Sequence, residues 1–188
     1  MAVRDSMADL ISRVRELIGD AAGADQEFTD QVIQDTLDLR RRRTDAQYLS
    51  PVSSIGSGGS VSYLSYIADT GYWEDDVILQ NGSYDIIDAA SSPIAIDDVD
   101  LLTGQWTFSG HLASPVMLTG KTYDIYAAAA DMLEMWLAKV KLDYDFLSSG
   151  RTFKRSQQIE GLERLIKTYR GRSWVTTSHM IRTDMNVY

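Results

Sequence analysis

The sequence has no cysteine and only two histidines, His111 and His179, among 188 residues. The first absence excludes disulfides, cysteine-ligated zinc and cysteine nucleophiles. Two histidines in different neighbourhoods argue against a histidine zinc site or a Ser-His-Asp triad. We therefore expect a protein that is not an enzyme, without catalytic, cofactor-binding or metal-binding residues.

Long hydrophobic runs are also missing, since no stretch of about 18 apolar residues occurs. The N-terminal residues are charged and amphipathic, so we expect neither a membrane span nor a secretory signal, and an origin in the cytoplasm. With 44 % hydrophobic and 24 % charged residues, the composition is ordinary for one domain, or one domain with an insertion, that buries its own core.

Positive charge is absent between Arg43 and Lys121. Residues 44–120 carry a charge of −10 and the remainder +1, within a net charge of −9. Such segregation indicates two structural layers or two surfaces with different neighbours, although a solubilising surface remains an alternative. The acids that are candidates for an acidic channel lining or interface are Asp75, Asp76, Asp97, Asp98 and Asp100. They lack the glycine and the distal glutamate of a calcium loop, so no metal site is expected.

Two helices are predicted at the start of the chain. The stripe of Leu10, Ile11, Val14, Leu17 and Ile18 predicts the first helix, with Asp5 or Ser6 as its cap. A second helix should begin near Thr29 and continue into four arginines, which would suit the negative end of the helix dipole. These arginines are Arg40, Arg41, Arg42 and Arg43.

Between about residues 46 and 120 the pattern becomes alternating, and short apolar runs are separated by turn residues. Asn81-Gly82 between two such runs predicts a β-hairpin, because both turn residues must accept positive φ. Further strands are expected around residues 61–68, 94–96, 105–108 and 116–118. The aromatic residues here, Tyr72, Trp73, Trp106 and Phe108, are interpreted as core or inter-subunit packing, since a segment without cations would repel nucleic acid.

Helical spacing returns at about Tyr123 and continues to Val140. Four consecutive alanines, residues 127–130, would let a neighbouring helix approach closely, so this helix should be the central one. A last helix carries Ile159, Leu162, Ile166 and Tyr169 on one face. After Gly171 come strand-like residues without a partner in the sequence, and we expect this tail to dock on another subunit by strand addition or through Trp174.

The motif Gly120-Lys121-Thr122 is a false lead towards nucleotide binding. A phosphate-binding loop needs a glycine five residues earlier, where this chain has Pro115, which lacks an amide hydrogen. We expect instead that Gly120 turns the chain out of a strand and that Thr122 caps the following helix.

The expected fold class is α+β, mainly α. A small bundle of about four helices, from residues 1–45 and 121–171, is interrupted by a β-rich acidic insertion at 46–120 and followed by a C-terminal docking tail at 172–188.

Several motifs resemble one protein family. These are Thr103-Gly104-Gln105-Trp106-Thr107-Phe108, the run from Leu118 to Asp124, the alanine run continued to Leu133, and residues 150–157. Together with the first two helices, they are similar to the head-to-tail connector (adaptor) proteins of tailed bacteriophages. The likeness covers nearly the whole chain, except that the β insertion is unusually long.

The resemblance implies a structural virion protein that forms a homo-oligomeric ring, commonly a dodecamer, in the phage neck. Such a ring binds the portal protein on one side and the next neck or tail protein, a stopper or tail terminator, on the other, after assembly in the host cytoplasm. DNA passes through during genome ejection without sequence-specific binding, so part of the acidic segment could line the channel. The tail would reach the portal or a neighbour through Arg172, Trp174, Val175, Met180, Ile181 and Tyr188.

One alternative stays open at this point. The four arginines at residues 40–43, with the cations of the last helix, could contact phosphates, as in a DNA-binding packaging accessory protein. A solvated helix end, or arginines that recognise an acidic protein surface, fits the same residues.

Overall fold

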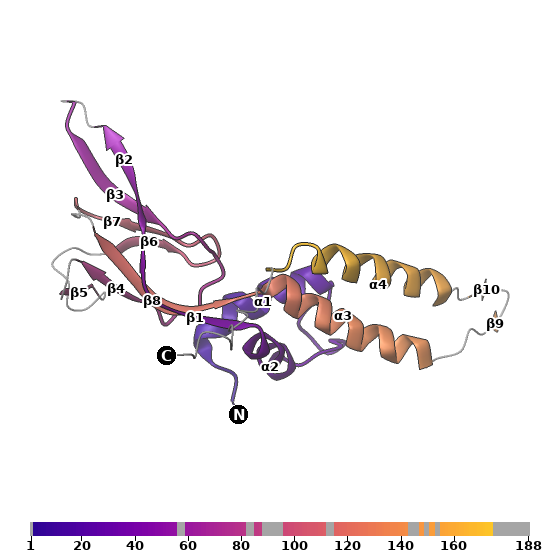
Figure 1. Cartoon of the computed structure of the whole chain (residues 1–188). Coiled ribbons are helices and arrows are strands. Elements are labelled where there is room, and N and C mark those ends of the chain that lie inside the picture. Colours follow the sequence, from indigo (N-terminus) through magenta and orange to yellow (C-terminus); the bar gives the residue numbers. More distant parts are fainter. Residues whose placement is uncertain are drawn as a thin grey trace, which may run out of the picture.

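The computed structural model describes residues 2–55, 59–81, 85–87, 96–111, 115–142, 147–148, 151–152 and 155–174. The chain has the expected α+β fold (Figure 1). The helices lie side by side in one half of the molecule and the sheets occupy the other half. The long strand β1 follows α2, and the long strand β8 leads into α3, so these two strands connect the sheets to the helical half.

The helical half confirms the predicted number of main helices within the described residues. Its elements are a 3-10 turn η1 (Asp5–Met7), α1 (Ala8–Ile18), α2 (Asp30–Leu39), α3 (Ile125–Leu142) and α4 (Arg155–Arg170). Helix α3 packs against each of the other three helices and is the central one. Ala128, Ala129 and Ala130 are completely buried, which is the close approach that four consecutive alanines predict.

The other half contains two antiparallel four-stranded sheets. One has the order β1-β8-β4-β5, and the other β2-β3-β7-β6. A short pair of strands, β9 and β10, completes the described strands. Their bounds are β1 (Arg41–Tyr48), β2 (Ser50–Ile55), β3 (Val61–Ile67), β4 (Ile78–Asn81), β5 (Asp85–Ile87), β6 (Ile96–Asp100), β7 (Gln105–Phe108), β8 (Val116–Tyr123), β9 (Leu147–Ser148) and β10 (Arg151–Thr152).

Aromatic side chains form the core between the sheets, as the sequence predicts. Trp73 and Trp106 meet edge to face with ring centroids 6.3 Å apart, and both are buried. Phe108 is also buried. Tyr72 instead packs edge to face on Tyr126 of α3, at 6.2 Å, so this aromatic residue joins the β-rich half to the helical core.

The predicted end of the second helix is wrong. Helix α2 stops at Leu39, and Arg41, Arg42 and Arg43 begin strand β1. Arg41 pairs with Tyr123 and Arg43 with Lys121 on β8. The ladder to β8 therefore outweighs the helical preference of arginine. Only Arg40, the C-cap residue of α2, lies at the helix end as predicted, whereas Arg41, Arg42 and Arg43 lie along a strand.

The predicted helix caps are only partly correct. Thr29 caps α2 through its hydroxyl, which accepts from the Val32 amide. Asp5 and Ser6 lie in η1, and α1 has no side-chain cap. The proposed cap Thr122 lies within β8, and Asp124 caps α3 instead, because its Oδ1 accepts from the Ala127 amide at 2.9 Å.

Two predicted turn positions also lie inside strands. Gly120 is in the middle of β8, opposite Thr44, where a Cβ atom would come within 2.9 Å of Val77. The glycine is needed for close packing and not for a turn. The Asn-Gly hairpin does form between β4 and β5, but Asn81 is its last paired residue, opposite Asp85.

Gly104 and Gly161 give opposite predictions for alanine substitution. Gly104 has φ +75°, and an added Cβ would lie 2.5 Å from the Thr70 carbonyl oxygen, so Gly104→Ala should destabilise the fold by about 2–3 kcal/mol. Gly161 lies inside α4, where an added Cβ would meet no atom within 4 Å apart from the adjoining helix backbone, so Gly161→Ala should stabilise the fold by about 0.5–1 kcal/mol. Urea unfolding of both variants tests this, and a similar sign for the two would contradict it.

Candidate interaction surfaces

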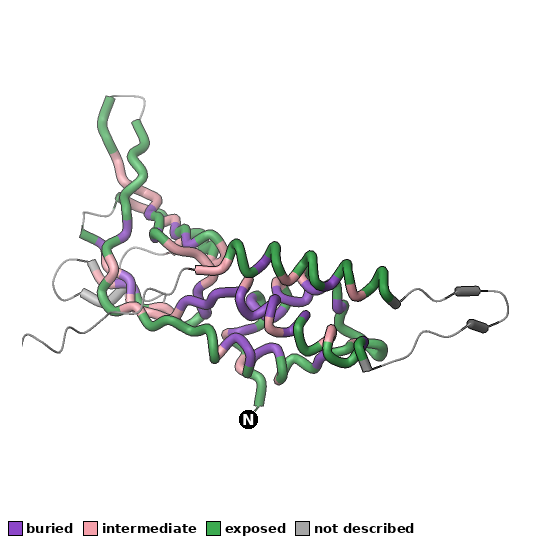
Figure 2. The backbone as a smooth tube through the Cα atoms, turned by 45° about the vertical axis from the view of Figure 1, so that its right-hand side comes forward, coloured by how far each residue is buried: buried purple, intermediate pink, exposed green. Residues whose placement is uncertain are grey.

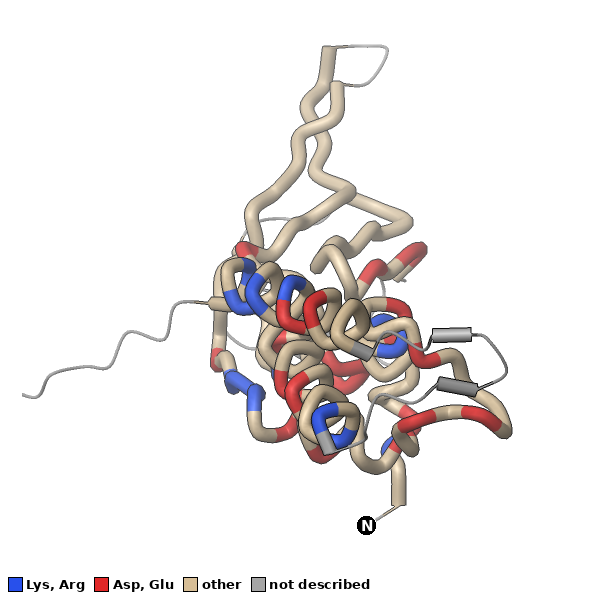
Figure 3. The backbone as a smooth tube through the Cα atoms, turned by 90° about the vertical axis from the view of Figure 1, so that its right-hand side faces the viewer, with Lys and Arg blue, Asp and Glu red and all other residues tan. Residues whose placement is uncertain are grey.

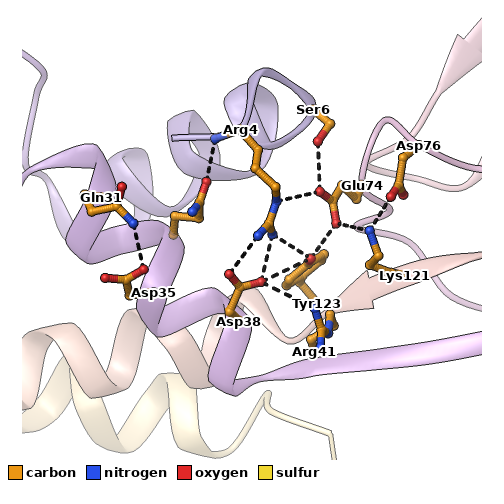
Figure 4. Close-up of polar contacts among 11 residues, drawn as sticks. Arg4, Ser6, Gln31, Asp35, Asp38, Arg41, Glu74, Asp76, Lys121 and Tyr123 are labelled. Carbon is orange, nitrogen blue, oxygen red and sulfur yellow. Dashed lines mark hydrogen bonds and ion pairs between the residues drawn. The ribbon is translucent and has the colours of Figure 1, made fainter. Parts of the chain in front are cut away.

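A buried carboxylate, that of Glu74, lies at the junction of the two halves (Figure 4). It accepts hydrogen bonds from Tyr123 Oη at 2.6 Å, Ser6 Oγ at 2.8 Å, Arg4 Nε at 2.9 Å and Lys121 Nζ at 3.2 Å. Arg4 also makes a two-pronged contact with Asp38 of α2, and Lys121 also binds Asp76. We call these seven residues the Glu74 cluster. It joins the N-terminal segment, α2, β8 and the segment that leads into β4.

The cluster is electrostatically satisfied. Burial opposes ionisation of Glu74, but the hydrogen bonds from Tyr123, Ser6 and Lys121 outweigh it and lower the pKa of this carboxyl. Burial, together with the hydrogen bond to Glu74, raises the pKa of Tyr123. The bond to Asp76 raises the pKa of Lys121. A fully partnered, ionised network of this kind holds two structural units together.

Other ion pairs of the helical half are structural as well. Buried Arg15 contacts Asp20, Asp30 and the Phe28 carbonyl oxygen, which fixes the connection between α1 and α2. Arg40 of the predicted basic group forms two hydrogen bonds with Asp131 of α3, and Arg170 of α4 shares the same carboxylate.

Two surface hollows are lined by described residues of the helical half, and several of their charged side chains belong to these ion pairs. One, of about 370 Å³, is lined by the α1–α2 connection and Trp136. Its acids include Asp20, bound to Arg15, and Glu27, bound to Lys139. The other, of about 210 Å³, is lined by Arg4 and Arg15.

The five candidate acids do not act as one group. Asp76 is paired with Lys121, and Asp100 accepts from the amides of Leu102 and Thr103, which fixes the β6–β7 turn. Asp75 is exposed. Asp97 and Asp98 lie exposed on β6, an edge strand, and no cation of the described residues pairs with them. Asp97, Asp98 and Asp100, which are close together in the sequence, therefore lie along strand β6.

The beginning of the predicted docking tail is fixed to the helical half. Asp124 Oδ2 accepts from the Trp174 amide and from Ser173 Oγ, both at 2.7 Å. The Arg172 guanidinium lies 5.8 Å from the ring centre of Tyr126. The other expected docking residues, Val175, Met180, Ile181 and Tyr188, lie outside the described residues.

The β2–β3 hairpin, which we call the arm, is a surface that sequence reasoning missed. It projects away from the rest of the molecule (Figures 1 and 2). Every residue of β2 is exposed, and among the described strands β2 pairs only with β3. Apolar side chains are exposed along it, including Ile55 at 77 % and Val61 at 54 %. One signal was available, because residues 46–68 contain no charged side chain.

Comparison with protein-family models, curated proteins and solved structures found no match for this chain. Two structural tests are negative for the part of the chain that is described. No helix there is both long and apolar enough to cross a membrane. No group of three or more metal-ligating side chains comes together there.

Glu74→Gln should test the junction. Because the pKa of Glu74 is lowered on folding, its contribution to stability is present above about pH 4.5 and is lost as the pH falls through the folded-state pKa. We expect a loss of about 2–3 kcal/mol at pH 7, since the partly exposed cations Arg4 and Lys121 lose the buried carboxylate that they share. The difference from the wild type should shrink in acid.

Urea unfolding between pH 3 and pH 7 measures both effects. The control is Glu160→Gln on the surface of α4, where an exposed ion pair with Arg164 is removed and the change should stay within about 0.5 kcal/mol. A pH-independent loss for Glu74→Gln would contradict the assignment.

Proposed function

We propose that this chain is a structural subunit of a homo-oligomeric ring in the neck of a tailed phage, where it joins the portal to the next neck or tail protein. It works without catalysis and forms part of the conduit for DNA in the virion. The arm is the observation that carries this proposal. The family resemblance of residues 102–172 is the reason for placing the proposed ring in the phage neck.

The arm is poorly suited to an isolated monomer. A two-stranded hairpin in water is marginally stable, and β3 gains a second neighbour, β7, only at residues 65–67. Pro51 and the register shift between Val52 and Ser53 hinder strand addition on β2, but no charged side chain protects the arm, and Ile55 and Val61 remain exposed on it as apolar surface. These properties favour an arm that is covered by another protein after assembly.

The charged groups support a structural role. The shifted pKa values of Glu74, Lys121 and Asp131 follow from ion pairs that join chain segments. Each of these groups already has its hydrogen-bond partners within the fold. A catalytic acid or base would need access to a substrate.

One observation favours the alternative of a DNA-binding packaging accessory protein. Arg41, Arg42 and Arg43 are exposed, and no carboxylate of the described residues lies within ion-pair distance of Arg42. Phosphate binding by these residues would fall steeply with salt. Fluorescence anisotropy with a duplex at about 50 and 200 mM salt distinguishes the two functions, since a ring subunit should show negligible affinity for free DNA.

Mass photometry and electron microscopy of the chain, with and without the portal protein of the same virus, test the ring. We expect a closed ring, alone or on the portal, and its mass gives the subunit number. A persistent monomer under both conditions would contradict the proposed function.

Ile55→Asp tests the role of the arm. The side chain is 77 % exposed, so the melting temperature should change by no more than about 2 °C, whereas a buried carboxylate at a subunit contact should weaken assembly at least about tenfold. The control is Ala24→Asp on the exposed α1–α2 connection, which adds the same charge away from the arm. Equal assembly of both variants would show that the arm makes no contact.

A further inference from the structure

The two sheets end in edge strands of opposite charge. Strand β1 is the outer strand of one sheet and begins with Arg41, Arg42 and Arg43, which we call the basic edge. Strand β6 is the outer strand of the other sheet and contains Asp97 and Asp98, which we call the acidic edge. All five side chains are exposed.

The arginines of the basic edge make only weak ion pairs within the chain. Arg41 reaches Asp38 only at 4.0 Å. Arg43 contacts Asp45, but the two side chains are 75 % and 67 % exposed, and such surface pairs contribute little. Arg42 has no ion pair with any carboxylate that the structure describes. The guanidinium groups therefore remain available to an outside partner.

The two edges cannot neutralise each other in one molecule. Figure 3 shows the blue residues of β1 on one side of the molecule and the red residues of β6 on the opposite side. Two complementary patches on opposite sides of a chain allow a head-to-tail contact between copies, in which each copy uses both patches. Such a contact closes into a ring when the rotation between copies permits it.

We propose that the basic edge of one copy docks on the acidic edge of the next copy. This inference rests on the proposed ring and identifies one of its subunit contacts. Guanidinium groups bind carboxylates through two parallel hydrogen bonds, which gives the contact direction as well as attraction. It explains both edges together, whereas a phosphate partner would account for the arginines alone.

Side chains, and not a continuous sheet, make this contact. The ladder of β1 shifts register between Thr44 and Gln47, where Ala46 has φ +51°, and the ladder of β6 shifts between Ile96 and Asp98. Bulges of this kind twist an edge strand away from simple strand addition. The contact therefore depends on ionic strength more than a backbone ladder would.

Charge reversal on each edge tests the contact. One variant carries Arg42→Glu and Arg43→Glu, and the other carries Asp97→Arg and Asp98→Arg. Each variant alone brings like charges together, and we expect self-association about 100-fold weaker than that of the wild type. An equimolar mixture should assemble again, because the acidic edges of one variant then face the basic edges of the other.

Native mass spectrometry of the mixture should find the two variants in equal numbers, and circular dichroism confirms that each is folded. The matched controls reverse exposed charges elsewhere, with Lys167→Glu on α4 and Asp25→Lys on the α1–α2 connection. They should assemble as the wild type does. A milder double variant, Arg42→Gln with Arg43→Gln, should lose less self-association than the charge reversal does. It serves as the test if the reversal variant fails to fold.

A normal ring from either reversal variant alone would overturn the contact while leaving the ring in place. If the Arg42→Glu, Arg43→Glu variant forms that ring and has also lost a measurable affinity of the wild type for duplex DNA, the arginines are assigned to phosphate. A wild-type chain that stays monomeric with the portal would overturn the ring itself, and this contact with it.

Discussion

The fold depends on one buried carboxylate, that of Glu74. Between Arg43 and Lys121 the chain has ten acids and no cation, so an acid buried there needs charges from elsewhere. Arg4 comes from the N-terminal segment and Lys121 from β8, while Tyr123 of β8 donates the shortest bond. An uneven charge distribution in the sequence thus becomes a specific attachment of the acidic segment to the helical half.

Burial is greatest near this attachment and in the helical half, and it decreases along the arm. Buried residues gather where the helices meet β1 and β8, and the arm is exposed towards its tip (Figure 2). The acidic edge and the arm belong to the sheet β2-β3-β7-β6, which contributes Trp106 and Phe108 to the core between the two sheets. The strands of the arm therefore have few buried contacts of their own, whereas the segments joined by the Glu74 cluster are well packed.

Much of the fold follows from hydrophobic spacing, because burial decides it locally. The stripe around Val14 and the alanines of α3 face the core as predicted. The predictions from sequence were wrong where contacts with residues far away in the chain determine the local structure. Arg42 has the local setting of a helix end, yet pairing with Thr122 on β8 places it in a strand. Ser6 is a good capping residue, but its hydroxyl donates to Glu74. No local pattern could show either partner.

The two proposed roles of the basic edge compete for the same side chains. If Arg42 and Arg43 bind the acidic edge of the next copy, those cations are neutralised in the assembled ring and are withdrawn from phosphate. Each subunit then keeps a net charge of −9 with its basic edge covered. In the proposed contact, Asp97 and Asp98 of the next copy would be covered together with these arginines, so the local charges would cancel. The proposed contact and the proposed passage of DNA are compatible for this reason, because arginines held by carboxylates would no longer attract the phosphate backbone.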